Sequence, residues 1–354
     1  MNTDAVAIDT RHIAGYRRMA VKRALALGGA FVVMLWLVIL DLSIGPSGMP
    51  LSDVISAILA GPHDGDRAAT TIIWYLRMPQ SLMAVVVGMC LGIAGLQMQT
   101  ILDNPLASPF TLGFSAAAGF GAALSIMFGA ALPLPEYLIT PIAAFAMTIV
   151  ACLIVYGMVH ALGETPEILV LCGIGVLFLF QSLQSLLQYL ASPEILQQIV
   201  FWLFGSLLKA NWTSVAVTSL VAFACVPLIL SDTWKLTVLR LGDANAASLG
   251  ISVGRLRRRS FVLIALLTAA AVSFVGTIGF VGLVAPHVAK ALVGEDHRFS
   301  IPLSAMVGAV ILASASVFGK LISPGGVIPV GIITAVAGIP MLFLVIYARK
   351  RRSA

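Results

Sequence analysis

The chain has 354 residues, of which 60% are hydrophobic and only 10% are charged, with a mean hydropathy of +1.03 and a formal net charge of +6. Soluble globular proteins carry about 25% charged residues, so this composition excludes a water-soluble protein. Lipid must be the solvent for most of the chain.

Ten stretches are long and apolar enough to cross a bilayer, which takes about 20 residues each. The first follows the polar, basic segment 1–23 and has no convincing cleavage site after it, so we predict a retained span rather than a signal peptide. The ten predicted spans are 24–42, 81–102, 110–131, 137–159, 167–190, 212–231, 260–276, 278–293, 302–322 and 329–348.

Two connections between these spans have a predicted structure of their own. Residues 51–59 have apolar side chains at helical spacing, with Asp53 outside the apolar stripe, which predicts a short interfacial helix. Apolar sequence runs almost unbroken from Ser260 to Ala289, so length requires two crossings there, and Gly276 and Gly279 favour a turn between them. The loops leave no room for an extramembrane enzyme domain.

Positive charge predicts the orientation of the ten spans. With a cytoplasmic N-terminus, that side receives 17 of the 21 Lys and Arg residues, and the opposite side keeps Arg67, Arg77, Lys209 and Lys320. We therefore expect both termini on the cytoplasmic side of the membrane. The basic run Arg349–Arg352 is interpreted as a topological anchor, because no aromatic and basic interleaving indicates nucleic-acid binding.

The sequence offers no energy source and no cofactor site. The spans contain almost no ionisable residues that could sense a coupling ion, and Lys320 is expected to reach the interface from a span end. The phosphate-binding loop is absent, since Gly319-Lys320 is followed by Leu321. The four cysteines lie in apolar segments without CxxC spacing, and the five histidines are scattered, which favours neither disulfides nor a metal site.

Glycines at four-residue spacing indicate close helix packing, as for Gly88 with Gly92 and for Gly113 with Ala117 and Gly121. In the stretch 274–298, Pro286 frees a main-chain carbonyl in the eighth span. We interpret His287 as structural, with a metal-ligand or gating role as the alternative, and the Asp296 and Arg298 pair as a loop brace.

Residues 232–259 form the longest loop on the basic side. A short helical segment in this loop is predicted to end at Gly250. Leu241, Ala246 and Leu249 would give it a small apolar face, flanked by Asp243 and Arg255. Such a helix outside the membrane favours a docking element for a partner, and a bare connector is the alternative.

Four stretches of the chain, in order, carry a family resemblance: residues 75–119, FWLFGSL at 201–207, residues 239–259, and residues 274–298 with 327–340 beyond them. Together they resemble the FecCD-type permeases of ATP-binding-cassette (ABC) importers, which take up iron chelates and cobalamin. The chain departs from the family pattern at Gln80 and Lys290, where arginines are usual, at Ser316 and Lys320 in place of an Asp-x-x-x-Arg pattern, and at Val327 in place of Glu.

The resemblance implies an all-α, polytopic, homodimeric type II ABC importer permease with about ten transmembrane helices per chain. Its domains would be a cytoplasmic segment 1–23, a permease domain 24–348 with the coupling loop 232–259, and a basic tail 349–354. The partners would be a second copy of the chain, two cytoplasmic ATPase subunits that bind ATP and Mg²⁺, and a periplasmic binding protein. The chain itself would hold no cofactor and have no ATPase site.

The cargo implied is a ferric siderophore, with haem or cobalamin as the alternative; a membrane-embedded enzyme or scaffold is the distant alternative. The coupling residues expected from the resemblance are Leu241, Gly242, Asp243, Ala247, Leu249 and Gly250. Those expected to dock the binding protein are Arg77, Gln80 and Lys320. Signature or pathway residues are Gln97, Asn104, Pro105, Trp202, Gly205, Ser206, Gly279, Pro286 and His287.

Overall fold

The computed structural model of the chain describes residues 10–45, 48–62, 67–129, 133, 135–163, 165–323 and 326–353. The regular structure within these ranges is entirely helical, which confirms the all-α expectation. Each of the ten predicted spans contains a helix: α1 (Thr10–Ser43), α4 (Met78–Ile101), α5 (Phe114–Phe128), α6 (Glu136–Leu162), α7 (Pro166–Leu190), α9 (Trp212–Leu230), α12 (Val253–Val275), α13 (Val281–Val293), α14 (His297–Ile322) and α15 (Val330–Ser353).

Seven of these helices are long and apolar enough to cross a membrane, namely α1, α4 with the turns before it, α6, α7, α9, α12 and α14. The apolar parts of α5, α13 and α15 are shorter, with α15 apolar over Val330–Met341. The other helices are α2 (Leu51–Ala60), α3 (Arg67–Thr70), the π-helix η1 (Thr71–Arg77), α8 (Pro193–Leu203), α10 (Thr233–Leu239) and α11 (Asp243–Ser248).

The structure moves several predicted boundaries. The helix of the second span is continuous from Ala68, because α3 and η1 lead directly into α4. Helix α1 already begins at Thr10 and α15 continues to Ser353, so helix runs through the boundaries predicted at 23 and 348. Residues 1–9 and 354 lie outside the described residues.

Helix α8 was not predicted at all. It is amphipathic and too short for a span, and only Ile199 is buried. Its start follows a local rule, because the Ser192 side chain accepts a hydrogen bond from the Ile195 main-chain N–H and Pro193 occupies the first helical position.

Helix α4 lies inside the bundle and is buried over most of its length. Its glycines allow the close approach that the sequence predicted. A Cβ on Gly88 would collide with the Gly308 carbonyl of α14, and a Cβ on Gly92 would collide with the Ser304 carbonyl. The Ser304 hydroxyl also donates to the Gly92 carbonyl at 2.8 Å. Backbone contact and this interhelical hydrogen bond replace the hydrophobic driving force that is missing in lipid.

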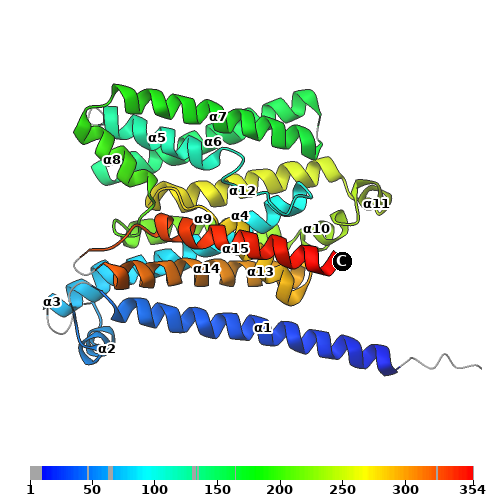
Figure 1. The fold of residues 1–354 in the computed structure, drawn as a ribbon, viewed down its shortest axis with the longest axis horizontal. Helices are drawn as coiled ribbons and strands as arrows, with labels where there is room; N and C mark the ends of the chain where they lie inside the picture. The colour runs from blue at the N-terminus through cyan, green and yellow to red at the C-terminus, as the bar shows by residue number, and fades with distance from the viewer. Residues whose placement is uncertain are drawn as a thin grey trace, which may run out of the picture.

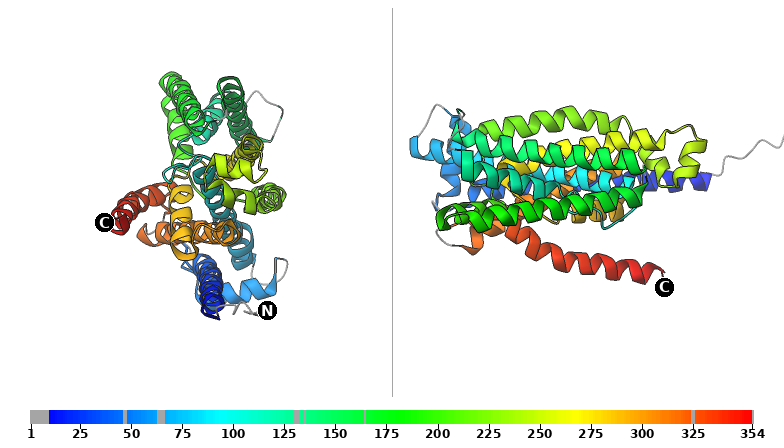
Figure 2. Two further views of the ribbon diagram at one scale, coloured as in Figure 1. Left: turned by 90° about the vertical axis from the view of Figure 1, so that its right-hand side faces the viewer. Right: turned by 90° about the horizontal axis from the view of Figure 1, so that it is seen from above.

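The peripheral helices expose large apolar side chains. Helices α1 and α7 lie at opposite edges of the bundle (Figure 1), and the C-terminal part of α15 diverges from the other helices (Figure 2). Their outward side chains are apolar, for example Trp36 at 58% exposure and Phe343 at 65%. A hydrophobic surface on this scale fits a bilayer environment.

The bundle has two distinct ends (Figure 1). The α11 end carries the start of α1, the helices α10 and α11, and the loops 102–113 and 294–296. The α8 end carries α2, α3, η1, α8 and the turn 276–280. This turn falls where the sequence predicted a break between two crossings, and Gly276 ends α12 with φ at +77°.

Candidate functional site

Helix α11 is a short helix that stands at one end of the bundle, and its C-terminal turn is a Schellman motif. The Ile251 N–H donates to the Ala246 carbonyl at 3.1 Å, and the Gly250 N–H donates to the Ala247 carbonyl at 2.9 Å. Gly250 has a φ of +81°, which glycine adopts without the cost of a Cβ. The predicted helix end at Gly250 is therefore confirmed, and the motif turns the chain back into α12.

The surface of α11 is almost fully exposed. Leu241 and Leu249, which flank the helix, are 63% and 59% exposed, whereas Ala246 is buried. The prediction that Ala246 forms part of the outward apolar face was wrong, because this side faces the bundle. Gly242, Asp243, Ala247 and Gly250 are exposed as expected. Leu241 and Leu249 therefore leave apolar side chains exposed just before and just after α11.

An arginine of α12 holds α11 against the bundle. Arg257 forms two parallel hydrogen bonds to the Asp243 carboxylate, at 2.7 and 2.8 Å. Its Nε donates to the carbonyl of Ile101, the last residue of α4, at 3.0 Å. Sequence analysis placed Arg255 beside α11, but Arg255 is exposed and Arg257 is only 6% exposed. The two arginines point in different directions because residues two apart on a helix lie about 200° apart.

Further ion pairs join the same end. Arg240, at the end of α10, lies 2.9 Å from Glu295 in the loop between α13 and α14. Asp232 pairs with Lys235 at 2.7 Å and with Arg259 of α12 at 2.9 Å. The segment 232–259 is therefore attached to the bundle at several points.

The loop between α13 and α14 is braced as the sequence predicted. Asp296 pairs with Arg298 at 3.0 Å, and Arg23 of α1 lies 3.5 Å from the same carboxylate while stacking over the Phe299 ring. Partial burial raises the pKa of Asp296, but the hydrogen bonds and charges of Arg298 and Arg23 lower it by more, so the net pKa is below the usual value.

A buried histidine next to this loop was missed. His297 is fully buried at the start of α14. Its ring nitrogens lie 2.8 Å from the Thr100 hydroxyl of α4 and 3.3 Å from the Thr237 hydroxyl of α10. Sequence analysis did not single out His297, because its hydroxyl partners come from two segments distant in the chain.

Gln99, which sequence analysis did not select, lies beside His287. Gln99 Nε2 lies 3.5 Å from His287 Nδ1 and donates to the Leu283 carbonyl, and its Oε1 accepts from Lys290 at 2.9 Å. His287 is half-buried, with Nδ1 2.8 Å from the Leu283 carbonyl one helical turn before it. This arrangement fits the structural interpretation of His287.

Gln97 is instead 1% exposed in the core, and neither its Oε1 nor its Nε2 has a hydrogen-bond partner among the described residues. It lines no open surface of the chain. The other two signature residues of this region, Asn104 and Pro105, are half-buried in the loop after α4. The Asn104 side chain accepts from the Leu106 N–H at 2.9 Å, so it fixes the turn that ends α4.

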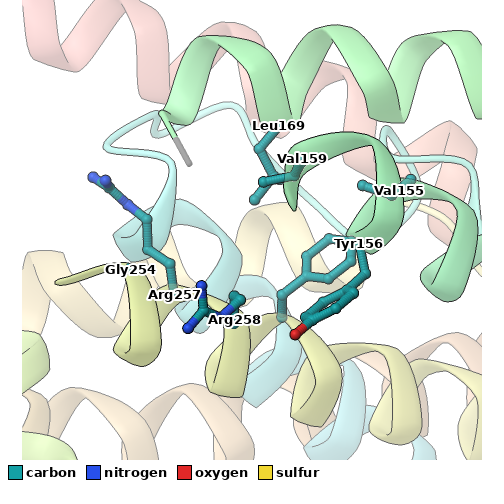
Figure 3. A pocket seen from close by; sticks show the side chains of 8 residues that line it. Val155, Tyr156, Val159, Leu169, Gly254, Arg257 and Arg258 are labelled. Carbon is teal, nitrogen blue, oxygen red and sulfur yellow. The ribbon is translucent and has the colours of Figure 1, made fainter. Parts of the chain in front are cut away.

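A small hollow opens at the α11 end between α6, α7 and the start of α12 (Figure 3). Its walls include Tyr156, Leu169 and the stems of Arg257 and Arg258. It has room for about one water. No group of three His, Cys, Asp or Glu side chains arranged to hold a metal occurs in the part of the chain that the structure describes.

At the α8 end, the segment FWLFGSL meets the turn 276–280. The Ser206 N–H donates to the Val275 carbonyl at 2.7 Å, and the Gly331 N–H donates to the Gly205 carbonyl at 3.2 Å. Gly205 has a φ of +68°, and a Cβ there would collide with the Thr277 carbonyl. The two sequence signatures therefore form one junction, which also holds the start of α15.

Trp202 and Gly279 belong to the same junction. Trp202 packs against a cluster of small residues from α5, α6 and α12. A Cβ on Gly279 would meet nothing within 4 Å, so this glycine faces open space. Both lie near the surface that the chain presents at the α8 end.

The three residues expected to dock a partner at this end do not share a surface. The Arg77 side chain is buried and donates to the Leu42 and Ser43 carbonyls at 2.7 and 3.2 Å. The Lys320 side chain is 4% exposed and pairs with Asp41, so the expectation that it reaches the interface was wrong. Gln80 is half-exposed and donates weakly to the Leu208 carbonyl at 3.5 Å.

Among the side chains that the structure describes, Lys209 is an exposed cation at this end, beside the Gln80 contact. Sequence analysis counted Lys209 for topology and did not select it as a docking residue. Its position directly after FWLFGSL, in a short loop before α9, was the available signal. The side chain of Arg67 lies outside the described residues.

Comparison with known proteins places these features in a family. The model of the FecCD transport family matches residues 33–348. The ferric enterobactin transport permease FepD of Escherichia coli is 33% identical over 95% of this chain and 99% of its own length. The Fe(3+)-citrate import permease YfmD of Bacillus subtilis is 34% identical over 92% and 94%, respectively.

Cobalamin and structural relatives also match. The cobalamin import permease BtuC of Halobacterium salinarum is 34% identical over 81% of this chain and 76% of its own length. A solved structure described as a metal-chelate type ABC transporter in an inward-facing conformation superposes with a TM-score of 0.81 and 28% identity, covering 91% of this chain and 98% of the other.

Proposed function

The chain belongs to the FecCD transport family and is therefore a transmembrane permease of an ABC importer, and we propose that two copies of it carry a ferric siderophore across the bacterial inner membrane. The cargo would pass from a periplasmic binding protein, between the two permeases, into the cytoplasm. Two cytoplasmic ATPase subunits, which bind ATP and Mg²⁺, would supply the free energy.

The observation that carries this proposal is helix α11. It presents Leu241 and Leu249 outward at one end of the bundle while Asp243 is held by a buried arginine. Exposed leucines before and after a helix that Arg257 attaches to the bundle suit insertion into a groove on an ATPase subunit. Gly242, Ala247 and Gly250 would allow close approach of the partner to the α11 backbone.

We propose that the α11 end faces the cytoplasm. Lys235, Arg240 and the arginines at 255, 257, 258 and 259 lie in or next to the 232–259 segment at that end. Cytoplasmic loops carry an excess of Lys and Arg. The helical start of α1 and the C-terminal turn of α15 would then both be cytoplasmic.

The α8 end would receive the binding protein. Gln80 and the exposed Lys209 lie next to each other there and would supply polar contacts. Arg77 and Lys320 would act indirectly, since their buried side chains hold the helices that carry this surface. Electrostatic contacts of this kind mainly speed and orient association.

The pathway would run along the twofold axis between two copies. The hollow between α6, α7 and α12 admits about one water, which is far too small for a chelate. Trp202, Gly205, Ser206 and Gly279 would line the entrance at the α8 end. The iron-chelate relatives favour a ferric siderophore, and the cobalamin relative keeps cobalamin, with haem, as the alternative cargo.

The test is reconstitution of the complex that forms around the tagged chain in its own membranes. A ferric hydroxamate siderophore, ferric citrate, haem and cobalamin are each loaded onto the co-purified binding protein. We expect the ferric siderophore to stimulate ATP hydrolysis by the complex most strongly. Accumulation of cargo against a gradient by the chain alone in vesicles would overturn the proposal, as would the absence of any ATPase subunit.

A further inference from the structure

We infer that Arg257 is the positioning residue that makes α11, the start of α12 and the C-terminal end of α4, at Ile101, move as one unit. The inference rests on the proposed docking of an ATPase subunit to α11. It states how a displacement of that small exposed helix reaches the core of the bundle.

The guanidinium of Arg257 is shared between two elements. Two of its N–H groups are directed at the Asp243 carboxylate of α11, and Nε is directed at the Ile101 carbonyl of α4. The last carbonyls of a helix lack partners within the helix and carry partial negative charge. A planar guanidinium can serve a carboxylate and such a carbonyl at once, which an ammonium group cannot do in the same geometry.

The other contacts between this segment and the bundle are made by α10 and the residue after it. Thr237 of α10 lies 3.3 Å from the His297 ring. Arg240 pairs with Glu295, and their side chains are 25% and 51% exposed. Water and salt screen such a pair, and exposed pairs contribute little. The Arg257 side chain is 7% exposed and its contact with Asp243 is bidentate, so this link has a defined geometry.

The other end of the link is the most buried helix of the bundle. Helix α4 packs against α12, α13 and α14, and its Gln99 contacts Leu283 and Lys290 of α13. A shift of Ile101 therefore displaces the neighbours of α4 as well. One turn beyond Arg257, Phe261 packs on Phe114 of α5 with ring centroids 5.3 Å apart, so α5 is joined to the same unit.

The Schellman motif at Gly250 already fixes α11 to α12. Arg257 adds a direct contact between α11 and the last residue of α4, beside the packing of α12 against α4. Without it, α11 and α12 would still move together, but the C-terminal end of α4 would follow them only through side-chain packing. This difference is measurable.

The experiment places spin labels on Ser248→Cys in α11 and Leu106→Cys in the loop after α4. The four native cysteines are buried, so the labels react at the introduced sites. Distances are measured in the complex with its ATPase subunit, without nucleotide and with a non-hydrolysable ATP analogue. In the otherwise unchanged chain we expect the distance to differ by less than about 2 Å between the two states.

Arg257→Gln should broaden this distance distribution and make it depend on nucleotide, while ATP hydrolysis stimulated by the binding protein falls by about tenfold. Asp243→Asn should have the same effect, because it breaks the same contact from the other side. Asp243 is half-exposed, so its replacement leaves the core intact. Arg257→Lys should be intermediate. The matched control is Arg255→Gln, which removes the same charge from an exposed site on the same helix turn.

Unchanged distances and stimulation in both Arg257→Gln and Asp243→Asn would overturn the inference while leaving the proposed function in place. An equal effect of Arg255→Gln would also overturn it, because net charge would then be the cause. If the unaltered chain binds no ATPase subunit, the proposed function fails and the inference fails with it.

Discussion

Asp41 and Lys320 lie 279 residues apart and form a buried ion pair at the α8 end. Lys320 Nζ lies 2.8 Å from Asp41 Oδ1 and donates to the Asp41 main-chain carbonyl at 2.9 Å. The Ser81 hydroxyl donates to the other carboxylate oxygen. Three helices, α1, α4 and α14, are therefore joined at one point by groups that lipid cannot solvate.

Removing the lysine should destabilise the protein strongly. Lys320→Met leaves the Asp41 carboxylate buried without its cation, which costs about 3 kcal/mol or more in the free energy of unfolding. Thermal unfolding of the purified protein in detergent measures this loss. Lys209→Met is the control, because Lys209 is exposed at the same end and should leave stability nearly unchanged. Adding Asp41→Asn to Lys320→Met should restore part of the stability. Equal stability of Lys320→Met and Lys209→Met would show that the buried ion pair does not stabilise the fold.

The close contact of α4 with α14 predicts a strong steric effect at Gly92. Gly92→Leu would push a side chain into the Ser304 carbonyl, and overpacking of this kind costs about 1–3 kcal/mol or more. We expect a lower yield of folded protein and a lower melting temperature. Gly175→Leu is the matched control, since a Cβ at Gly175 meets nothing within 4 Å. Equal stability of both variants would show that the contact between α4 and α14 does leave room for a side chain at Gly92.

The exposed leucine of α11 predicts a selective loss of coupling. Leu249→Asp should weaken binding of the ATPase subunit by about 2 kcal/mol, because a charge would enter an apolar contact. Membrane insertion and stability should not change, since Leu249 is 59% exposed. Co-purification of the ATPase subunit measures the effect. Leu106→Asp, at a 49% exposed site outside α11, is the control, and retention of full binding by Leu249→Asp would exclude α11 as the docking helix.

The Gln97 amide, which has no hydrogen-bond partner among the described residues, predicts that its removal will not lower stability. Gln97→Met removes two buried polar atoms without a partner, so stability should be unchanged or rise by about 1 kcal/mol. Gln99→Met, two residues away, should lower stability because it leaves Lys290 without its hydrogen bond. Melting temperatures of the two variants test this contrast. A loss of transport in Gln97→Met at unchanged stability would instead show a role in the transport cycle.

Several features of the fold could be predicted from local sequence. Each of the ten predicted spans contains a helix, and the turn near Gly276 and the helix end at Gly250 were also correct. These follow from hydropathy, length and glycine conformation, which act over a few neighbouring residues. Helix α8 was missed because a short amphipathic helix has no hydropathy signal for a span.

The residues at the functional sites were harder to choose. Sequence analysis placed Arg255 beside α11, whereas Arg257, two residues further along α12, contacts Asp243. It selected Gln97 as a signature residue and did not select Gln99, which contacts His287. Residues two positions apart lie on nearly opposite sides of a helix. Sequence alone did not reveal which side of each helix faces which neighbour.

The order of apolar, basic and glycine residues in the sequence was sufficient to predict a membrane protein with repeated helical spans and to identify the motifs that it shares with a transport family. The burial of Arg77 and Lys320 and the link from α11 to α4 through Arg257 became visible only in the folded chain. Transfer into lipid depends on each segment's own side chains, whereas the environment of a charge depends on partners brought close by packing across hundreds of residues.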